Sequence, residues 1–461
     1  MQLERPANFP AQLDLRLTQV TARLAVLDGE LTPEIAASIA RVASISDFVV
    51  SVLLRQPEQL IARLLDTAPL SGESLRARID LSGLAEHQAM SALRRFRQIE
   101  MARIAWRDYS GWADLKTNLE DLSTLADTLV QVALDYAAAQ LQPRFGRPRD
   151  KEDRPASLLV LGMGKLGGRE LNYSSDIDLV FLYPEQVVID GQAGEEAEAY
   201  FRRVAQLLIK LLDQVTDDGF VFRVDTRLRP FGTSGPLVVS IAAFESYLTR
   251  HGRDWERYAY VKARLLTGLQ YHDELFNEIL TPFVYRRYLD YGVFGALRQM
   301  KKLISEEVQR KDMANNIKLG PGGIREIEFI VQTFQLVRGG RDPALVTPSL
   351  LIVLPRLADL WQHAEGVAAD LMRAYAVLRI TENRLQAMDD RQSHELPKGR
   401  ERRDRLAYAM NEPDWEAYMQ CLNEHRLVVE TEFNRVAWEA VNISVEGEFD
   451  SKYSPPPRQR G

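Results

Sequence analysis

The sequence predicts an α+β protein in which a small mixed sheet lies between two helical regions. Two patterns indicate this fold class. Near both ends of the chain, apolar residues recur at three- and four-residue steps, whereas 157 to about 265 contains short apolar runs separated by glycine turns. A chain of 461 residues is also too long for a single core. We therefore expect an N-terminal helical domain (1–150), a mixed α/β domain (151–265), a C-terminal helical bundle (266–445) and a linker or disordered tail (446–461).

Helix signals dominate the N-terminal region. Thr32 and Pro33 form a start signal, because threonine can cap a helix and proline is favoured at its first position. Long amphipathic stretches predict helices over 87–109 and 125–141. The next segment, 142–157, has three prolines and little apolar content, so we expect a linker and a domain boundary there.

The periodicity changes in the middle of the chain. Apolar runs predict strands over 157–163, 176–183, 219–230 and 236–241, and an amphipathic stretch predicts a helix over 195–215. After about residue 265 the pattern becomes helical again. This order of elements predicts the small sheet and the helices that follow it.

Composition narrows the class of protein and its location. The net charge is −7 and the pI is about 5.6, so no affinity for nucleic acid or for an anionic membrane surface is implied. No run approaches the roughly 18 apolar residues of a membrane span. Cys421 is the only cysteine, and the first residues lack the apolar core of a secretory signal. We expect a cytoplasmic protein.

A glycine pattern after the first predicted strand has two opposing interpretations. Gly162, Gly164 and Gly167 match the G-x-G-x-x-G fingerprint of dinucleotide-binding folds. Such a fold needs a long crossover helix and an acid about 20 residues beyond the glycines. Here the second strand starts about eight residues after Gly168, and its acids stand at its beginning. The spacing therefore excludes a dinucleotide site, and the chain also lacks the Walker motif G-x-x-x-x-G-K-[ST].

Three aspartates favour the second interpretation, a metal and phosphate site. Asp176 and Asp178 project from one face of an extended strand, about 6.6 Å apart along the backbone. By the same alternation Asp225, Arg227 and Arg229 share one face of the third predicted strand. Ionised carboxylates at the end of an apolar strand are costly unless a cation compensates them. The three aspartates are therefore candidate catalytic residues and ligands of Mg²⁺, with a two-metal site expected.

This arrangement is typical of the nucleotidyltransferase superfamily represented by DNA polymerase beta. In that pattern a glycine-containing pair is followed, ten or so residues later, by D-x-D and then by an acid on another strand. Gly164 and Lys165 occupy the place of the pair, ten residues before Asp176. Glycine lets the backbone approach a phosphate closely, and the lysine adds positive charge.

Longer blocks resemble one family within this superfamily. The blocks are "GMGKLGGRELNYSSDIDLVFLYPE" (162–185), "VDTRLRPFGTSGPLVVS" (224–240), "WERYAYVKAR" (255–264) and "REIEFIVQ" (325–332). They are similar to the bacterial bifunctional glutamine synthetase adenylyltransferase/adenylyl-removing enzymes, which carry two nucleotidyltransferase units in tandem. The chain resembles the first of these units, the adenylyl-removing one, over essentially its whole length.

The resemblance implies a metal-dependent phosphorolysis. Inorganic phosphate would attack the AMP group on a tyrosine of adenylylated glutamine synthetase and release ADP, and the PII signalling protein would be a regulatory partner. The residues expected to bind nucleotide or phosphate are Gly164, Lys165, Ser175, Arg227, Arg229, Lys262 and Arg264. Two alternatives stay open: transfer of AMP from ATP to a protein tyrosine, and a non-catalytic module that binds nucleotide or PII.

A glycine-rich turn at 320–323 precedes another predicted helix. Its amide groups could hold an anion, and Arg325, Glu328 and Gln332 would share one face of that helix. The same pattern is equally typical of a loop that packs the last domain. The sequence leaves both interpretations open.

Overall fold

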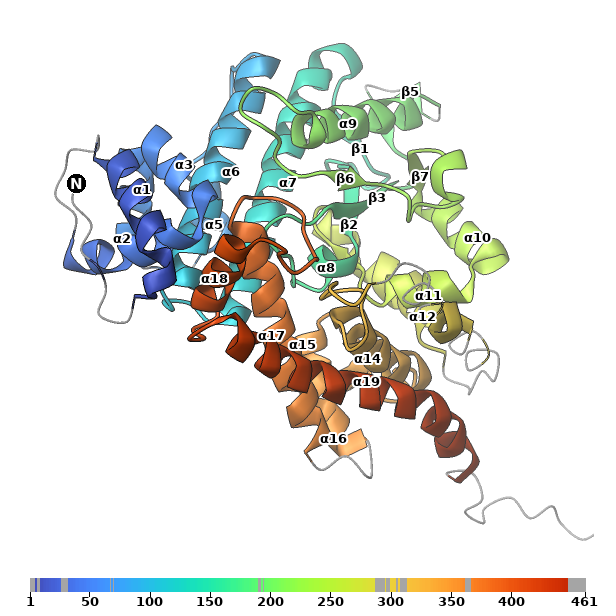
Figure 1. Cartoon of the computed structure of the whole chain (residues 1–461). Helices are drawn as coiled ribbons and strands as arrows, with labels where there is room; N and C mark the ends of the chain where they lie inside the picture. The colour runs from blue at the N-terminus through green and yellow to red at the C-terminus, as the bar shows by residue number, and fades with distance from the viewer. Residues whose placement is uncertain are drawn as a thin grey trace, which may run out of the picture.

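The computed structural model of the chain describes residues 5, 9–25, 32–66, 68, 70–189, 192–193, 195–286, 295, 299–303, 306, 313–360 and 366–446. The tail predicted for 446–461 lies almost entirely outside these residues. Figure 1 shows the small sheet between N-terminal helices (blue to cyan) and C-terminal helices (orange to red). The α+β class predicted from the sequence is confirmed.

The N-terminal part is helical, as predicted. Its helices are α1 (Asp14–Leu24), α2 (Pro33–Ile45), α3 (Asp47–Arg55), α4 (Pro57–Leu65), α5 (Gly72–Arg76), α6 (Glu86–Tyr109) and α7 (Leu115–Phe145), preceded by the 3-10 turn η1 (Ala11–Leu13). Thr32 caps α2 by accepting a hydrogen bond from the backbone N–H of Ile35. The helix predicted over 125–141 is longer than expected, because Asp114 caps its start through the N–H of Thr117.

The predicted linker over 142–157 contains regular structure. Helix α7 continues through Pro143 to Phe145, and β1 (Pro148–Arg149) pairs with β4 (Val188–Ile189), which in turn pairs with β5 (Gln192–Ala193). Hydrophobic side chains on both sides of this segment belong to one continuous core. The domain boundaries drawn from the sequence stay predictions.

The main sheet has the strand order β6–β3–β2–β8, with β7 also paired to β3. Its strands are β2 (Leu159–Gly162), β3 (Ile177–Tyr183), β6 (Val224–Asp225), β7 (Val238–Ser240) and β8 (Arg264–Leu265). Strands β2 and β3 are antiparallel, with Gly162 opposite Leu179. A dinucleotide-binding fold needs these two strands to be parallel, so the structure agrees with the exclusion made from spacing.

The third predicted strand is much shorter than the sequence indicated. Strand β6 contains only Val224 and Asp225, not 219–230. The chain turns directly afterwards, because the Asp225 carboxylate accepts a hydrogen bond from the backbone N–H of Arg227 at 2.8 Å. The alternation that placed Asp225, Arg227 and Arg229 on one strand face is therefore wrong.

The helix predicted over 195–215 is α9 (Glu195–Asp213), which packs on α7 and on the sheet. In Figure 1 it lies above the strands, and the short α8 (Gly164–Gly167) lies below them. Helix cover on both sides explains why β3 is buried along most of its length.

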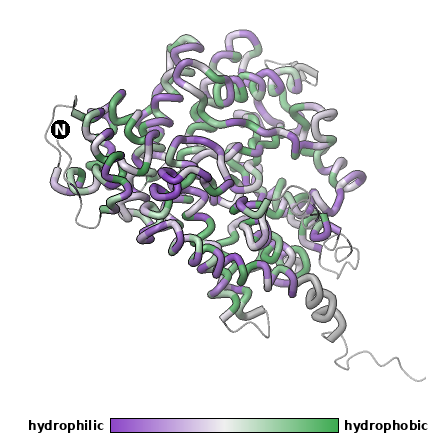
Figure 2. The backbone as a smooth tube through the Cα atoms, in the orientation of Figure 1, coloured by the Kyte–Doolittle hydropathy of each residue, from purple (hydrophilic) through white to green (hydrophobic). Residues whose placement is uncertain are grey.

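The chain after β6 is mainly helical, with β7 and β8 between its first helices. The helical elements are η2 (Gly232–Ser234), α10 (Ile241–His251), α11 (Asp254–Tyr260), η3 (Leu269–Tyr271), the π-helix η4 (Asp273–Leu280), α12 (Thr281–Val284), α14 (Ile324–Arg338), η5 (Pro343–Leu345), α15 (Leu350–Val353), η6 (Leu354–Arg356), α16 (Leu357–Leu360), α17 (Val367–Ala387), α18 (Arg400–Ala409) and α19 (Trp415–Glu446). Helices α14, α17 and α19 pack together. Hydrophobic and hydrophilic segments alternate along the helices, as expected of helices with one buried side (Figure 2).

The two helical regions also contact each other directly. The Ser46 hydroxyl donates to the carbonyl of Ala387 at 2.7 Å, and the Tyr109 hydroxyl donates to that of Arg384 at 2.7 Å.

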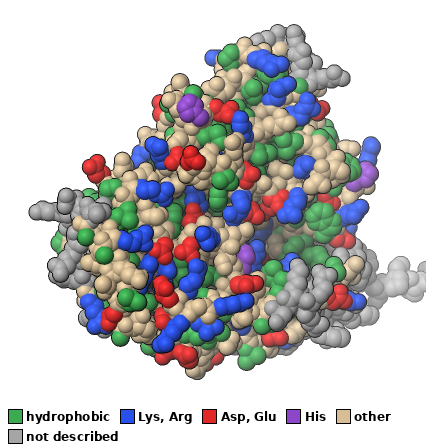
Figure 3. Space-filling model, turned by 45° about the horizontal axis from the view of Figure 1, so that its top comes forward, with side chains coloured by type: hydrophobic (Ala, Val, Ile, Leu, Met, Phe, Trp, Pro, Cys, Tyr) green, Lys and Arg blue, Asp and Glu red, His purple; other side chains and the backbone are tan. Residues whose placement is uncertain are grey.

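No helix in the described part of the chain is long and apolar enough to span a bilayer. On the face drawn in Figure 3, acidic and basic side chains are interspersed.

Candidate functional site

A tight glycine turn joins β2 to β3 and approaches the first acidic strand. Gly164 has a φ of 56°, which favours glycine, and a Cβ at this position would lie 3.1 Å from Oδ2 of Asp178. The backbone N–H of Met163 donates to the carbonyl of Asp178 at 2.9 Å. At Gly167, a Cβ would lie only 1.7 Å from the carbonyl oxygen of Lys262. Gly167 therefore permits a backbone approach that any side chain would block, and Gly164 leaves room for the Asp178 carboxylate.

We expect Gly164→Ala to lower turnover by roughly ten- to a hundredfold, because the new methyl group would displace the Asp178 carboxylate. Gly83→Ala is the matched control: Gly83 has a φ of 73°, but nothing lies within 4 Å of its added Cβ. Both variants should lose about 1 kcal/mol of unfolding free energy from backbone strain. The measurement is turnover beside denaturant unfolding, and equal turnover of the two variants would contradict the steric role.

The aspartates lie where β3 and β6 run side by side. The strands are parallel, and Asp178 is directly opposite Asp225 in their register. Asp176, just before β3, is paired with Arg223, while Asp225 accepts from Nε of Arg227 at 2.8 Å. All three aspartates line one cavity.

The charges of these carboxylates act on one another. Burial, followed by the like charges of Asp225 and Asp176, raises the pKa of Asp178 from 3.8 to about 6. Hydrogen bonding from Arg227 lowers the pKa of Asp225. No group of three potential ligands within the described ranges is already arranged around a metal position. The donor set nevertheless fits a divalent cation, because a positive ion between these oxygens would remove the repulsion that Asp178 experiences.

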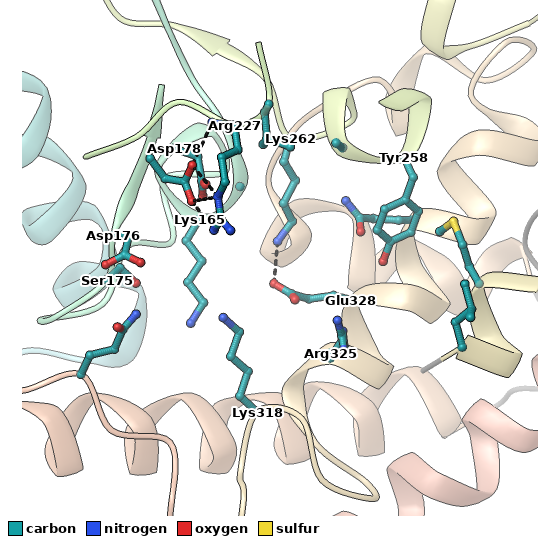
Figure 4. A pocket seen from close by; sticks show the side chains of 18 residues that line it. Lys165, Ser175, Asp176, Asp178, Arg227, Tyr258, Lys262, Lys318, Arg325 and Glu328 are labelled. Carbon is teal, nitrogen blue, oxygen red and sulfur yellow. Dashed lines mark hydrogen bonds and ion pairs between the residues drawn. The ribbon is translucent and has the colours of Figure 1, made fainter. Parts of the chain in front are cut away.

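The cavity has a volume of about 580 Å³ and brings together most of the residues predicted from the sequence (Figure 4). Those that line it are Gly164, Lys165, Ser175, Asp176, Asp178, Asp225, Arg227 and Lys262. Arg229 and Arg264 are not among the lining residues. Arg229 donates to Thr226 and Gly235 within its own loop, and Arg264 donates to both carboxylate oxygens of Asp127 at 2.9 Å. The geometry gives both arginines a role in holding loops.

Lys165 reaches from the glycine turn to a buried acid on α17. Its ammonium group donates to both carboxylate oxygens of Glu382 at 2.7 Å. Glu382 is also within 3.2 Å of Arg379 and 3.0 Å of His394. Burial lowers the pKa of Lys165 to about 7 despite the attraction of Glu382. The glycine turn is thus attached to the C-terminal helices by a buried ion pair.

Lys262 forms a second buried bridge between the sheet region and those helices. Its ammonium group lies 3.2 Å from Glu170 and 2.9 Å from Glu328 on α14. Although burial opposes ionisation of Glu328, Lys262 and Lys165 lower its pKa to about 2. A carboxylate held in this way is a weak base.

Several lining residues escaped the sequence analysis. Tyr258, Lys318 and Gln392 line the cavity, and Glu382 lies behind it. Arg325, Glu328 and Gln332, which the sequence placed on one helical face beside a glycine-rich turn, also line it. The glycine-rich turn was the only sequence signal for this side of the cavity. The other residues gave no signal, because they lie far along the chain from the aspartates.

Comparison with known proteins decides the family. The model of the glutamate-ammonia ligase adenylyltransferase family matches residues 36–279, more than half of the chain. The chain belongs to this family. Residues 298–437 match a second model, described as GlnD PII-uridylyltransferase. The nucleotidyltransferase class and the family resemblance predicted from the sequence are confirmed.

Curated relatives share the same similarity over most of the chain. A protein of Thioalkalivibrio sulfidiphilus is 46% identical over 405 residues, covering 87% of this chain and 42% of the relative. One of Methylococcus capsulatus is 50% identical over 347 residues, covering 75% and 37%, and one of Chromobacterium violaceum is 46% identical over 404 residues, covering 87% and 45%. Each is named a bifunctional glutamine synthetase adenylyltransferase/adenylyl-removing enzyme. The chain therefore spans less than half the length of these relatives.

Proposed function

We propose that this chain removes AMP from adenylyl-tyrosine on glutamine synthetase by phosphorolysis. The observation that carries the proposal is the layout of the cavity, which has aspartates on β3 and β6 and lysines from three other parts of the chain. The carboxylates, here called the acidic wall, suit metal-bound phosphate. The ammonium groups of Lys165, Lys262 and Lys318, here called the basic wall, suit a second, free phosphate anion. The names of the relatives support glutamine synthetase as the protein substrate.

In the proposed reaction, an oxygen of inorganic phosphate forms a bond to the phosphorus of AMP. The bond from this phosphorus to the tyrosyl oxygen breaks, and the oxygen leaves with the electron pair and takes a proton from solvent. The products are ADP and unmodified tyrosine. Divalent cations held by Asp176, Asp178 and Asp225 would neutralise charge on the phosphate oxygens. Gly164 would let the backbone approach the nucleotide phosphate.

Glu328, the cavity acid outside the proposed metal site, is poorly suited to activate water as the attacking group. Activating water needs a general base whose pKa lies near the operating pH. Glu328 is a poor base, because its ion pair with Lys262 lowers its pKa to about 2. Inorganic phosphate is already ionised, so it needs positive charge to hold it rather than a base to activate it.

The reverse direction is the second candidate, because the relatives' names include both activities. In that reaction the same cavity would hold ATP and transfer AMP to an unmodified tyrosine. The match of 298–437 to the PII-uridylyltransferase model supports the PII signalling protein as a regulatory partner in either direction. A cytoplasmic location goes with these partners.

Product identity tests the proposal. Adenylylated glutamine synthetase, Mg²⁺ and the chain are incubated with and without inorganic phosphate, and nucleotides are separated by chromatography. We expect ADP, formed only when phosphate is present. Equal amounts of free AMP in both samples would demonstrate hydrolysis, and incorporation of AMP from ATP without any removal would establish the transferase reaction instead.

A further inference from the structure

The segment that leads into the glycine-rich turn at 320–323 holds Lys318 in a fixed backbone position. The side chain of Asn316 accepts from the N–H groups of Lys318 at 3.0 Å and Leu319 at 2.7 Å. The Lys318 carbonyl accepts from the N–H of Arg325 at 3.0 Å. Gly322 has a φ of 65°, and a Cβ there would lie 2.2 Å from the carbonyl oxygen of Arg426. The turn is therefore packed tightly between α14 and α19.

The side chain of Lys318 extends from this turn into the cavity. In Figure 4 the ammonium groups of Lys318 and Lys165 point toward each other, with the aspartates beyond Lys165 and Glu328 to the side. Lys165 and Lys262 have carboxylate partners. Among the residues that the structure describes, the Lys318 ammonium makes no hydrogen bond or ion pair, although it lines the same cavity.

Two ammonium groups that face each other repel unless an anion lies between them. The like charge of Lys318 is one of the factors that lower the pKa of Lys165, and its attraction for the Asp178 carboxylate lowers the pKa of Asp178 as well. Lys318 is therefore close enough to affect both the turn and the acidic strand. A small anion with two negative charges would compensate both lysines at once.

We propose that Lys318, together with Lys165, binds the inorganic phosphate that attacks the adenylyl group. Each ammonium has three donors, and Glu382 takes two of those on Lys165, which leaves one for the anion. The proposal rests on the phosphorolysis proposed above and adds the co-substrate's binding site. Lys318 comes from the region that matches the PII-uridylyltransferase model, so this region would complete the active site of the sheet.

The same chemistry could instead hold the terminal phosphate of a nucleoside triphosphate. Orthophosphate is favoured because the aspartates already provide a place for the nucleotide phosphate across the cavity. A separate basic wall is then needed only if a second phosphate group enters independently. The experiment distinguishes these two sources.

The test uses the variants Lys318→Met and Lys318→Arg, with Lys398→Met as the matched control. Lys398 is an exposed lysine of the same helical region and lies outside the cavity. In phosphorolysis, Lys318→Met should raise the KM for phosphate by about ten- to a hundredfold, the effect of losing one charge-assisted hydrogen bond. Lys318→Arg should raise the KM for phosphate less than Lys318→Met does, and Lys398→Met should leave this KM unchanged. Thermal unfolding checks that all three variants fold.

A binding arm separates this inference from the proposed function. Binding of inorganic phosphate and of ATP to the chain with Mg²⁺ is followed by phosphorus NMR, without turnover. Weaker phosphate binding in Lys318→Met supports the inference even if the unsubstituted chain forms no ADP. Unchanged phosphate binding and unchanged KM overturn it, even if phosphorolysis is demonstrated. Weaker ATP binding with unchanged phosphate binding overturns it in favour of a triphosphate site.

Discussion

Asp178→Asn is expected to reduce turnover at least about a thousandfold, because one of the three carboxylates proposed to hold the metal is lost. The same substitution should stabilise the metal-free protein. In the folded chain the partly buried Asp178 experiences the like charges of Asp225 and Asp176, so its charged form is unfavourable. Asparagine has similar size and no charge. A loss of activity accompanied by a gain in stability is the signature of a residue placed for metal binding.

The stability gain should depend on pH with a definite sign. The pKa of Asp178 is raised from 3.8 to about 6 on folding, so the folded state binds this proton more tightly than the unfolded state. The unfolding free energy of the unsubstituted protein therefore falls as pH rises through this interval. Above it, Asp178→Asn should be more stable by up to about 3 kcal/mol. Below about pH 4 the difference should vanish.

The measurements are denaturant unfolding without metal at several pH values, and turnover at saturating Mg²⁺. Asp217→Asn is the control, since Asp217 is exposed and lies outside the cavity. It should change stability by less than about 0.5 kcal/mol and leave turnover unaltered. Near-normal turnover of Asp178→Asn would contradict its proposed catalytic role, and a loss of stability would contradict the repulsion among the aspartates.

Local patterns predicted β2, β3 and β7 of the sheet but not β8. Strands β2 and β3 are apolar runs bounded by turn residues, and nothing in their tertiary surroundings competes with that preference. The error at β6 is also local, because the Asp225 side chain binds the N–H of Arg227 and ends the strand. An aspartate in an extended pattern can satisfy a turn as readily as a strand, and alternation alone does not distinguish the two.

The partners of the basic residues around the cavity could not be predicted from the spacing of residues in the sequence. Arg264 was expected to bind phosphate, but Asp127 on α7 and the carbonyls of the glycine turn occupy its guanidinium group. Lys165 was expected to bind phosphate directly, and its main partner is Glu382. In each case the role depends on a partner more than a hundred residues away, which only tertiary structure brings close.

Glu382→Gln is expected to lower the unfolding free energy by about 3 to 5 kcal/mol, the usual effect of removing one partner from a buried ion pair. Glu382 is fully buried on α17 and faces Lys165, Arg379 and His394. Although burial opposes it, Lys165 first, and then contact with His394 and Arg379, hold the pKa of Glu382 well below its usual range. Glutamine preserves the size of the side chain but removes the carboxylate that pairs with Lys165 and Arg379 in the interior.

The pH dependence of this loss has the opposite sign to that of Asp178→Asn. A carboxylate whose pKa is lowered on folding contributes its stability above the unfolded-state value of 4.5 and loses it as pH falls toward the folded-state value. The difference between the unsubstituted chain and Glu382→Gln should be complete at neutral pH and shrink in acid. Glu416→Gln, at an exposed position on α19, should change stability by less than about 0.5 kcal/mol.

A double substitution tests whether Lys165 and Glu382 stabilise the fold as a pair. Lys165→Met combined with Glu382→Gln removes both charges, so it should be more stable than Glu382→Gln alone, and the coupling between the two sites should be about 1 to 3 kcal/mol. Recovery should be partial, because Arg379 keeps its bonds to Glu170 and Tyr375 but still loses Glu382. Additive effects would show that α17 does not stabilise the glycine turn through Lys165. Strong coupling would mean that the C-terminal helices fix the position of a residue in the glycine turn, and thus that the cavity forms only when both regions fold together.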